Sequence, residues 1–139
     1  METSKNKLSK AALGKRNRNK GNNAERYYAK FFREELGYDR CRTSREGSRL
    51  YDESGIDLMG IPVLIQIKAG RQQKLNYSQV LQGMDEKISK NFPVGYPEPD
   101  MPKVILHHKQ GKTGVERTAY DQLVIMTFNT FIHLLNNQK

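Results

Sequence analysis

The feature that most constrains the fold is a short apolar segment, residues 63–68, that carries two polar side chains. Side chains alternate along a strand, so Gln66 and Lys68 lie on one face of this segment, and Ile65 and Ile67 lie on the other. Burying an amide and an ammonium costs free energy unless each group finds a partner. The segment therefore predicts a buried strand whose two polar residues serve a purpose.

A helix is predicted upstream of this strand, from Asn22 to about Leu36. Apolar residues recur there at helical spacing, and Gly37 follows as a natural stop. The residues that set this pattern are Ala24, Tyr27, Tyr28, Phe31, Phe32 and Leu36.

The remaining chain reads as an alternation of strands and helices around a polar loop at residues 44–54. Strands are predicted at residues 38–43, 56–59, 62–68, 103–107 and 123–127, and helices at 77–90 and from 128 to the C-terminal end. This order predicts an α/β fold with a central mixed β-sheet flanked by α-helices. The length of 139 residues fits one such domain.

Residues 1–20 differ in composition, because they carry seven Lys or Arg against one acidic residue, a net charge of +6 of the chain's total of +9. Low hydrophobicity with like charge predicts little fixed structure. We expect a basic, flexible N-terminal arm at residues 1–20, followed by a single domain at residues 21–139. The arm either lies along DNA or serves only as a solubilising leader.

The whole-chain charge points to a nucleic-acid partner, since a basic surface binds phosphate backbones by releasing their counterions. The single cysteine, Cys41, excludes an internal disulfide and fits a reducing compartment. The longest apolar runs, at residues 63–65 and 123–126, are too short to span a bilayer. We expect a cytoplasmic, nucleic-acid-associated protein with no membrane partner.

A catalytic site can form if the strand that contains Asp57 pairs with the strand that contains Gln66 and Lys68. Asp57 would then ligate a hard divalent cation, with the Gln66 side-chain oxygen and the Ile67 carbonyl as further oxygen ligands. Lys68 would orient or help deprotonate the attacking water and stabilise charge on phosphorus. This set suits hydrolysis of phosphodiesters with Mg²⁺ or Mn²⁺. The alternative is an exposed ion pair on an edge strand.

These elements resemble the PD-(D/E)XK nucleases, in which an Asp is followed by Glu, Asp or Gln, then any residue, then Lys on the next strand. Here the elements are Asp57 and the run Gln66-Ile67-Lys68. Residues 20–26 are similar to the first-helix motif of that family, so the resemblance implies that Glu25 completes the metal shell. The resemblance covers about residues 20–70 and implies a restriction-endonuclease-like core. The family usually has Glu or Asp where this chain has Gln66.

The spacing of Gly37-Tyr38, Arg40, Arg42 and Ser44 before Asp57 is similar to archaeal and phage Holliday junction resolvases. The resemblance implies a structure-selective endodeoxyribonuclease that acts on Holliday junctions or other branched DNA. It also implies a homodimer that needs no small-molecule cofactor. A phage-encoded chain would act in the host cytoplasm. Two alternatives stay open: a repair or restriction-like nuclease acting on flaps or ends, and a non-catalytic DNA-binding protein on the same scaffold.

Basic and polar residues outside the predicted site are candidates for binding DNA phosphates. The alternative is that these residues form a solvated polar surface with no binding role. The candidates are Lys15, Arg16, Arg18 and Lys20 in the arm, Arg40, Arg42, Ser44 and Arg45 before the site, and Lys74 after it. His107 and His108 lack a third ligand at metal-binding spacing and are interpreted as strand-end residues.

Overall fold

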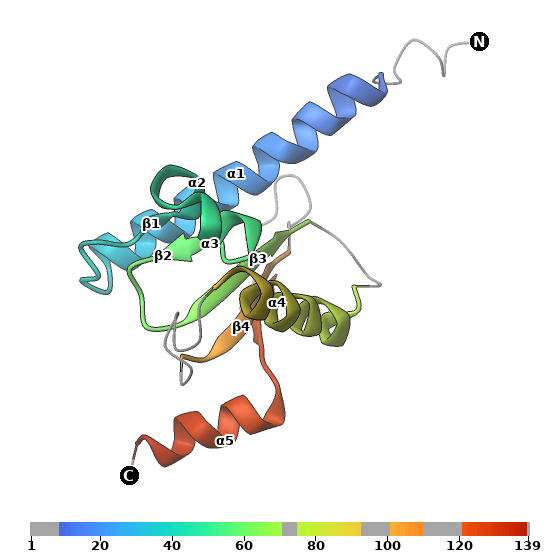
Figure 1. Ribbon diagram of the computed structural model, residues 1–139. Helices are drawn as coiled ribbons and strands as arrows, with labels where there is room; N and C mark the ends of the chain where they lie inside the picture. The colour runs from blue at the N-terminus through green and yellow to red at the C-terminus, as the bar shows by residue number, and fades with distance from the viewer. Residues whose placement is uncertain (1–8, 71–74, 93–100, 110–120, 139) are drawn as a thin grey trace.

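The computed structural model describes residues 9–70, 75–92, 101–109 and 121–138, with the backbone alone at 11, 13, 14 and 16–20. The chain is a mixed α/β protein, as predicted (Figure 1). Its elements are α1 (Lys10–Glu34), β1 (Arg42–Thr43), α2 (Ser44–Gly47), α3 (Arg49–Glu53), β2 (Leu58–Met59), β3 (Leu64–Ala69), α4 (Tyr77–Asn91), β4 (Lys103–His108), β5 (Gln122–Ile125) and α5 (Phe128–Asn136).

The strands form two small sheets rather than the single central sheet that the sequence predicts. In one sheet, β3 pairs in parallel with β4, and β4 pairs antiparallel with β5; in the other, β1 pairs antiparallel with β2. The chain before β2 does touch β3, because the Asp57 N–H donates to the Ile65 carbonyl at 2.7 Å. The next N–H on that side, from Ile67, bonds to the Asp57 side chain instead of a backbone oxygen. The backbone ladder therefore stops there.

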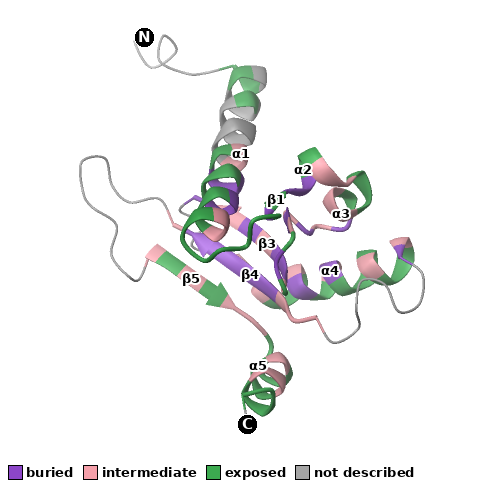
Figure 2. Cartoon of the chain, turned by 90° about the vertical axis from the view of Figure 1, so that its left-hand side faces the viewer, coloured by how far each residue is buried: buried purple, intermediate pink, exposed green. Residues whose placement is uncertain are grey.

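Helices α1 and α4 cover opposite faces of β3 and β4 (Figure 2). Ile65 and Ile67 pack in one core cluster with residues of α1, such as Tyr28. Leu64 packs in a second cluster with residues of α4, such as Leu81. Since side chains alternate along β3, its even-numbered residues, which include the two polar ones, share the α4 side of the sheet.

Helix α1 is longer than predicted, because it begins at Lys10 rather than at Asn22. The side chain of Ser9 accepts a hydrogen bond from the Ala12 N–H at 3.0 Å and caps the helix. The residues that follow are mostly Ala, Leu, Lys and Arg, which have high helix propensity despite their like charges. Residues 10–20, for which little fixed structure is expected in isolation, are therefore helical within the whole chain, and residues 1–8 lie outside the described residues.

The segment expected to be a loop, residues 44–54, forms the two short helices α2 and α3. The Ser48 side chain accepts a hydrogen bond from the Tyr51 N–H at 3.3 Å and so caps α3. The predicted strands at 38–43 and 56–59 shrink to two residues each, whereas α4, β4, β5 and α5 lie close to their predicted ranges. The sequence also predicts a loop at residues 95–99, which lies outside the described residues. Within the described part of the chain, no helix has the length and apolar character of a membrane span.

Candidate active site

Asp57 is held in place by three hydrogen bonds, two through its backbone and one through its carboxylate. Its N–H donates to the Ile65 carbonyl at 2.7 Å, and its carbonyl accepts from the Ser44 N–H at 2.9 Å. Its Oδ2 accepts from the Ile67 N–H at 2.7 Å. The carboxylate therefore sits against β3, beside the peptide that lies between the two polar residues of that strand.

Gln66 and Lys68 flank this peptide, and both are half-buried on the α4 side of β3. Among the described residues, neither side chain has a hydrogen-bond or ion-pair partner within the usual distances. Gly55 lies against Gln66, because a Cβ at Gly55 would be 3.6 Å from its Nε2, and Gly55 has a φ of +78°. The structure thus brings Asp57, Gln66 and Lys68 to one stretch of β3, as the sequence predicts.

Burial raises the pKa of Asp57 to about 7, and it does so despite the hydrogen bond from the Ile67 N–H, which lowers it. The charges of Glu25 and, to a smaller extent, Asp52 contribute to this increase, and the charge of Lys68 opposes it. A carboxylate with this pKa is only about half ionised near neutral pH. The site is therefore short of positive charge, and a cation placed against Asp57 would favour its ionised form.

Glu25 lies in the buried part of α1, with 5 % of its surface exposed. Its Oε2 accepts a hydrogen bond from Arg45 Nε at 3.1 Å, which is also an ion pair. Burial raises the pKa of Glu25, while Arg45 opposes the increase and Asp52 adds to it. The Arg45 side chain is 50 % exposed, so it can hold Glu25 and still present part of its guanidinium to solvent.

The described residues contain no group of three His, Cys, Asp or Glu side chains close enough to hold a metal. A cation at this site would depend on two carboxylates, from Glu25 and Asp57, supplemented by the Gln66 amide oxygen and the Ile67 carbonyl. In an extended strand the N–H and C=O of one residue point to the same side, so the Ile67 carbonyl faces the same edge as its N–H, toward Asp57. Mg²⁺ binds through few protein ligands and keeps several waters, which suits this donor set.

Two buried polar atoms near these residues, Ser44 Oγ and Asn22 Oδ1, have no hydrogen-bond partner in the described structure. Ser44 donates its N–H to the Asp57 carbonyl, and Asn22 lies one helical turn before Glu25. A buried polar atom left without a partner costs about 1–3 kcal/mol. These atoms are therefore better matched to water or a hydrated ion than to a dry core, and the residues present fit a hydrated divalent cation.

The residues predicted to bind DNA differ in their exposure to solvent. Lys15, Arg40 and Arg42 are exposed, and the two arginines line a depression of about 540 Å³ together with Arg33, Asp39, Cys41, Met59 and Gly60. Ser44 is fully buried, so its hydroxyl does not lie on the surface. The side chains of Arg16, Arg18 and Lys20, and all of Lys74, lie outside the described residues.

The sequence interpretation missed a histidine contact beside Lys68. His107 pairs with Lys68 in the β3–β4 register and is 1 % exposed. Its Nε2 lies 3.2 Å from the Gly70 carbonyl, so Nε2 donates and Nδ1 accepts from the Tyr77 hydroxyl at 2.5 Å. His107 therefore fixes the end of β3 two residues beyond Lys68. It does end a strand, as predicted, but its burial has no signal in the sequence.

Comparison with known proteins identifies no relative: no protein-family model, curated protein or solved structure matches this chain.

Proposed function

We propose that this chain is a metal-dependent endodeoxyribonuclease with a restriction-endonuclease-like core, and that it acts on branched DNA such as Holliday junctions. The observation that carries the proposal is the position of the Asp57 carboxylate. It is hydrogen-bonded to the peptide between Gln66 and Lys68, whose own side chains form no hydrogen bond or ion pair among the described residues. An acid, an amide and an ammonium in this arrangement suit the hydrolysis of a phosphodiester.

Asp57, Glu25, the Gln66 amide oxygen and the Ile67 carbonyl would hold Mg²⁺ or Mn²⁺. A bound divalent cation supplies Lewis-acid polarisation of a phosphate oxygen and neutralises charge at the reacting centre. Lys68 would place its ammonium where it can orient the attacking water and stabilise negative charge as it builds on phosphorus. The strand fixes the backbone of Lys68, because the next residues are tied to β4 and to His107.

The electrostatics of Asp57 support a role in binding a cation. Folding brings Asp57 under the influence of two other acids, Glu25 and Asp52, and partly buries it as well. Nothing in the packing of a stable core requires three acids in one neighbourhood, and their mutual repulsion lowers stability. A site that binds a divalent cation gives this arrangement a purpose.

The charge of the chain supports DNA as the substrate. The formal charge is +9, and the exposed Arg40 and Arg42 lie around a depression next to β2. Contacts of this kind position a phosphate backbone without reading base sequence. Symmetric cutting of two strands in a junction needs two active sites, so the proposal includes a homodimer.

The test is cleavage of a synthetic four-way junction and of a linear duplex of the same sequence, with Mg²⁺ or with EDTA. We expect Mg²⁺-dependent cutting that favours the junction and is lost in Asp57→Asn and Lys68→Met. Both variants should bind the junction within about twofold of wild type, and Lys87→Met, an exposed lysine of α4, should cut normally. Equal cutting of both substrates would remove the preference for branched DNA.

A non-catalytic DNA-binding protein is the second candidate. Gln66 favours it, because a neutral amide binds Mg²⁺ more weakly than a carboxylate. The ion pair between Arg45 and Glu25 favours it too, since Arg45 occupies an oxygen that a cation would need. Tight junction binding by wild type without cutting in Mg²⁺ or Mn²⁺ would select this candidate over the nuclease.

A further inference from the structure

Helix α5 presents its apolar side to solvent. Four large apolar residues recur at the spacing i, i+3, i+4 and i+7, which places them on one face of the helix. In most helices such a face packs on the core, but here its members are exposed by 39 to 73 %. With the neighbouring Val124 of β5, we call them the C-terminal apolar face: Val124, Phe128, Phe131, Ile132 and Leu135.

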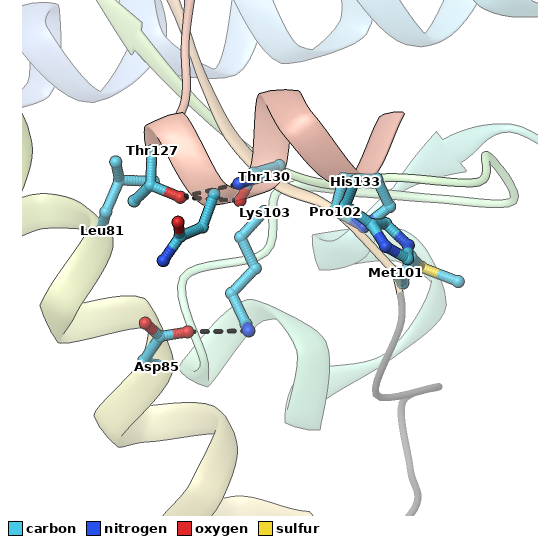
Figure 3. Close-up of a pocket in the computed structure, with 9 residues that line it drawn as sticks. Leu81, Asp85, Met101, Pro102, Lys103, Thr127, Thr130 and His133 are labelled. Atoms are coloured by element: carbon cyan, nitrogen blue, oxygen red, sulfur yellow. Dashed lines mark hydrogen bonds and ion pairs between the residues drawn. The ribbon is translucent and has the colours of Figure 1, made fainter. Parts of the chain in front are cut away.

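The inner side of α5 does not pack tightly on the rest of the chain. Figures 1 and 2 show the helix set apart from the layer formed by β3, β4 and α4. Thr127, Thr130 and His133 instead line a cavity of about 240 Å³, opposite Leu81, Asp85 and the start of β4 (Figure 3). The helix therefore has few contacts with the other described residues to hold it in place, and a partner on its outer side would supply more.

We propose that the C-terminal apolar face is where a second copy of this chain docks, with the two α5 helices packed against each other around a two-fold axis. The lack of charge on this face supports a second copy of the chain as the partner. Residues 122–138 contain no Asp, Glu, Lys or Arg, in a chain of which 28 % is charged and whose net charge is +9. Two copies repel each other through their basic surfaces, and this is a surface on which they can meet without bringing like charges together. The absence of cations also makes it a poor surface for nucleic acid.

The size of the face agrees with an interface between copies. Its five residues together expose apolar surface of the order of 400–500 Å². A standard stable interface buries about 800 Å² on each partner, so the face would supply more than half. An isologous dimer needs a surface that is complementary to itself, and an uncharged apolar helix stripe meets this condition. The dimer would supply the second active site that the proposed function needs, but the inference does not depend on catalysis.

The test is the mass of the full-length chain by sedimentation equilibrium between about 1 and 100 µM, after nuclease treatment and in high salt. We expect twice the chain mass of 16.1 kDa. Phe128→Asp is a suitable variant, because it replaces the most exposed residue of the face at the first position of α5, where an acid is favoured by the helix dipole. It should weaken dimerisation at least a hundredfold with an unchanged circular dichroism spectrum, and Phe131→Ser should do the same.

The matched control is Leu36→Asp, an apolar residue that is 54 % exposed beyond the end of α1. It should leave the dimer intact. A wild-type monomer over the whole concentration range would overturn the proposal, and so would a dimer unaffected by both phenylalanine variants. A dimer that disappears on nuclease treatment would show bridging by nucleic acid and would overturn it as well. DNA cleavage is not a readout here, so failure of this inference and failure of the nuclease proposal are distinguishable.

Discussion

The carboxylate of Asp57 and the backbone N–H of Ile67 are joined by a hydrogen bond of 2.7 Å, which takes the place of a backbone bond between two strands. This one contact ends the backbone pairing of the Asp57 segment with β3 and fixes the acid beside Gln66 and Lys68. It also gives the half-buried Asp57 carboxylate a hydrogen-bond partner.

Replacing Asp57 with Asn should stabilise the metal-free protein, and the gain should depend on pH. The folded state holds the Asp57 proton up to about pH 7, whereas the unfolded state releases it near 3.8. The stability that the protonated form contributes is fully present below about pH 3.8 and is lost as pH rises through about 7. Asn keeps an oxygen for the Ile67 N–H and carries no charge.

The free energy of unfolding in urea, measured without metal, should therefore be higher in Asp57→Asn than in wild type. The difference should be up to roughly 4 kcal/mol at pH 8 and much less at pH 5. Asp85→Asn is the control, because Asp85 is an exposed acid that forms an ion pair with Lys103. It should change stability by less than about 1 kcal/mol at either pH. A gain for Asp57→Asn that is the same at both pH values would contradict the raised pKa.

Binding of Mn²⁺ should follow the ionisation of Asp57, because a proton and a cation compete for the same carboxylate. With a pKa of about 7, the association constant should rise about tenfold per pH unit below pH 7 and level off above it. Calorimetric titrations at several pH values between 5.5 and 8.5 measure this. An affinity independent of pH over that range would show that Asp57 is not a ligand.

Gln66→Glu should tighten Mn²⁺ binding by about tenfold, since ligand charge is a main determinant of affinity for hard cations. The same change should lower the melting temperature of the metal-free protein by several degrees, because it adds a further carboxylate beside Asp57. Junction cleavage should be retained. Gln82→Glu, on an exposed position of α4, is the control and should change neither quantity. Unchanged metal affinity in Gln66→Glu would exclude Gln66 from the metal shell.

Arg40→Ala and Arg42→Ala should each reduce the dependence of DNA affinity on salt. Each arginine that neutralises a phosphate contributes about 0.9 to the slope of the logarithm of affinity against that of salt concentration. The slope should therefore fall by about that amount in each variant, and stay unchanged in Lys87→Ala. Fluorescence anisotropy between 50 and 300 mM salt measures it. Slopes identical to wild type in both arginine variants would place DNA elsewhere on the surface.

The strand that carries the site could be predicted from sequence because its signal is local. Alternation along residues 63–68 places Gln66 and Lys68 on one side of a buried strand, and this holds in the structure. The approach of Asp57 could be predicted as well, because only a tight turn separates the two segments. Gly60 makes that turn with a φ of +82°, and a Cβ there would lie 2.4 Å from the Arg40 carbonyl oxygen.

The parts that could not be predicted depend on contacts between distant residues. Arg45 meets Glu25 across 20 positions of sequence, and His107 meets Tyr77 across 30. Sequence spacing gives no sign of either contact. Nor does it show that the Asp57 side chain replaces a backbone acceptor, which divides the expected single sheet into two. The outward direction of the apolar stripe of α5 is a further case, because periodicity shows that a helix has an apolar face and not what that face packs against.

The central claim is that Asp57 and Gln66 bind one divalent cation through their side-chain oxygens. The most direct measurement is the anomalous scattering of a crystal of wild-type protein soaked in Mn²⁺. We predict a peak about 2.1–2.3 Å from an Asp57 carboxylate oxygen and the Gln66 Oε1, and no peak there in Asp57→Asn. A fully occupied Mn²⁺ peak elsewhere on the protein, or no peak beside Asp57 at saturating Mn²⁺, would contradict the claim.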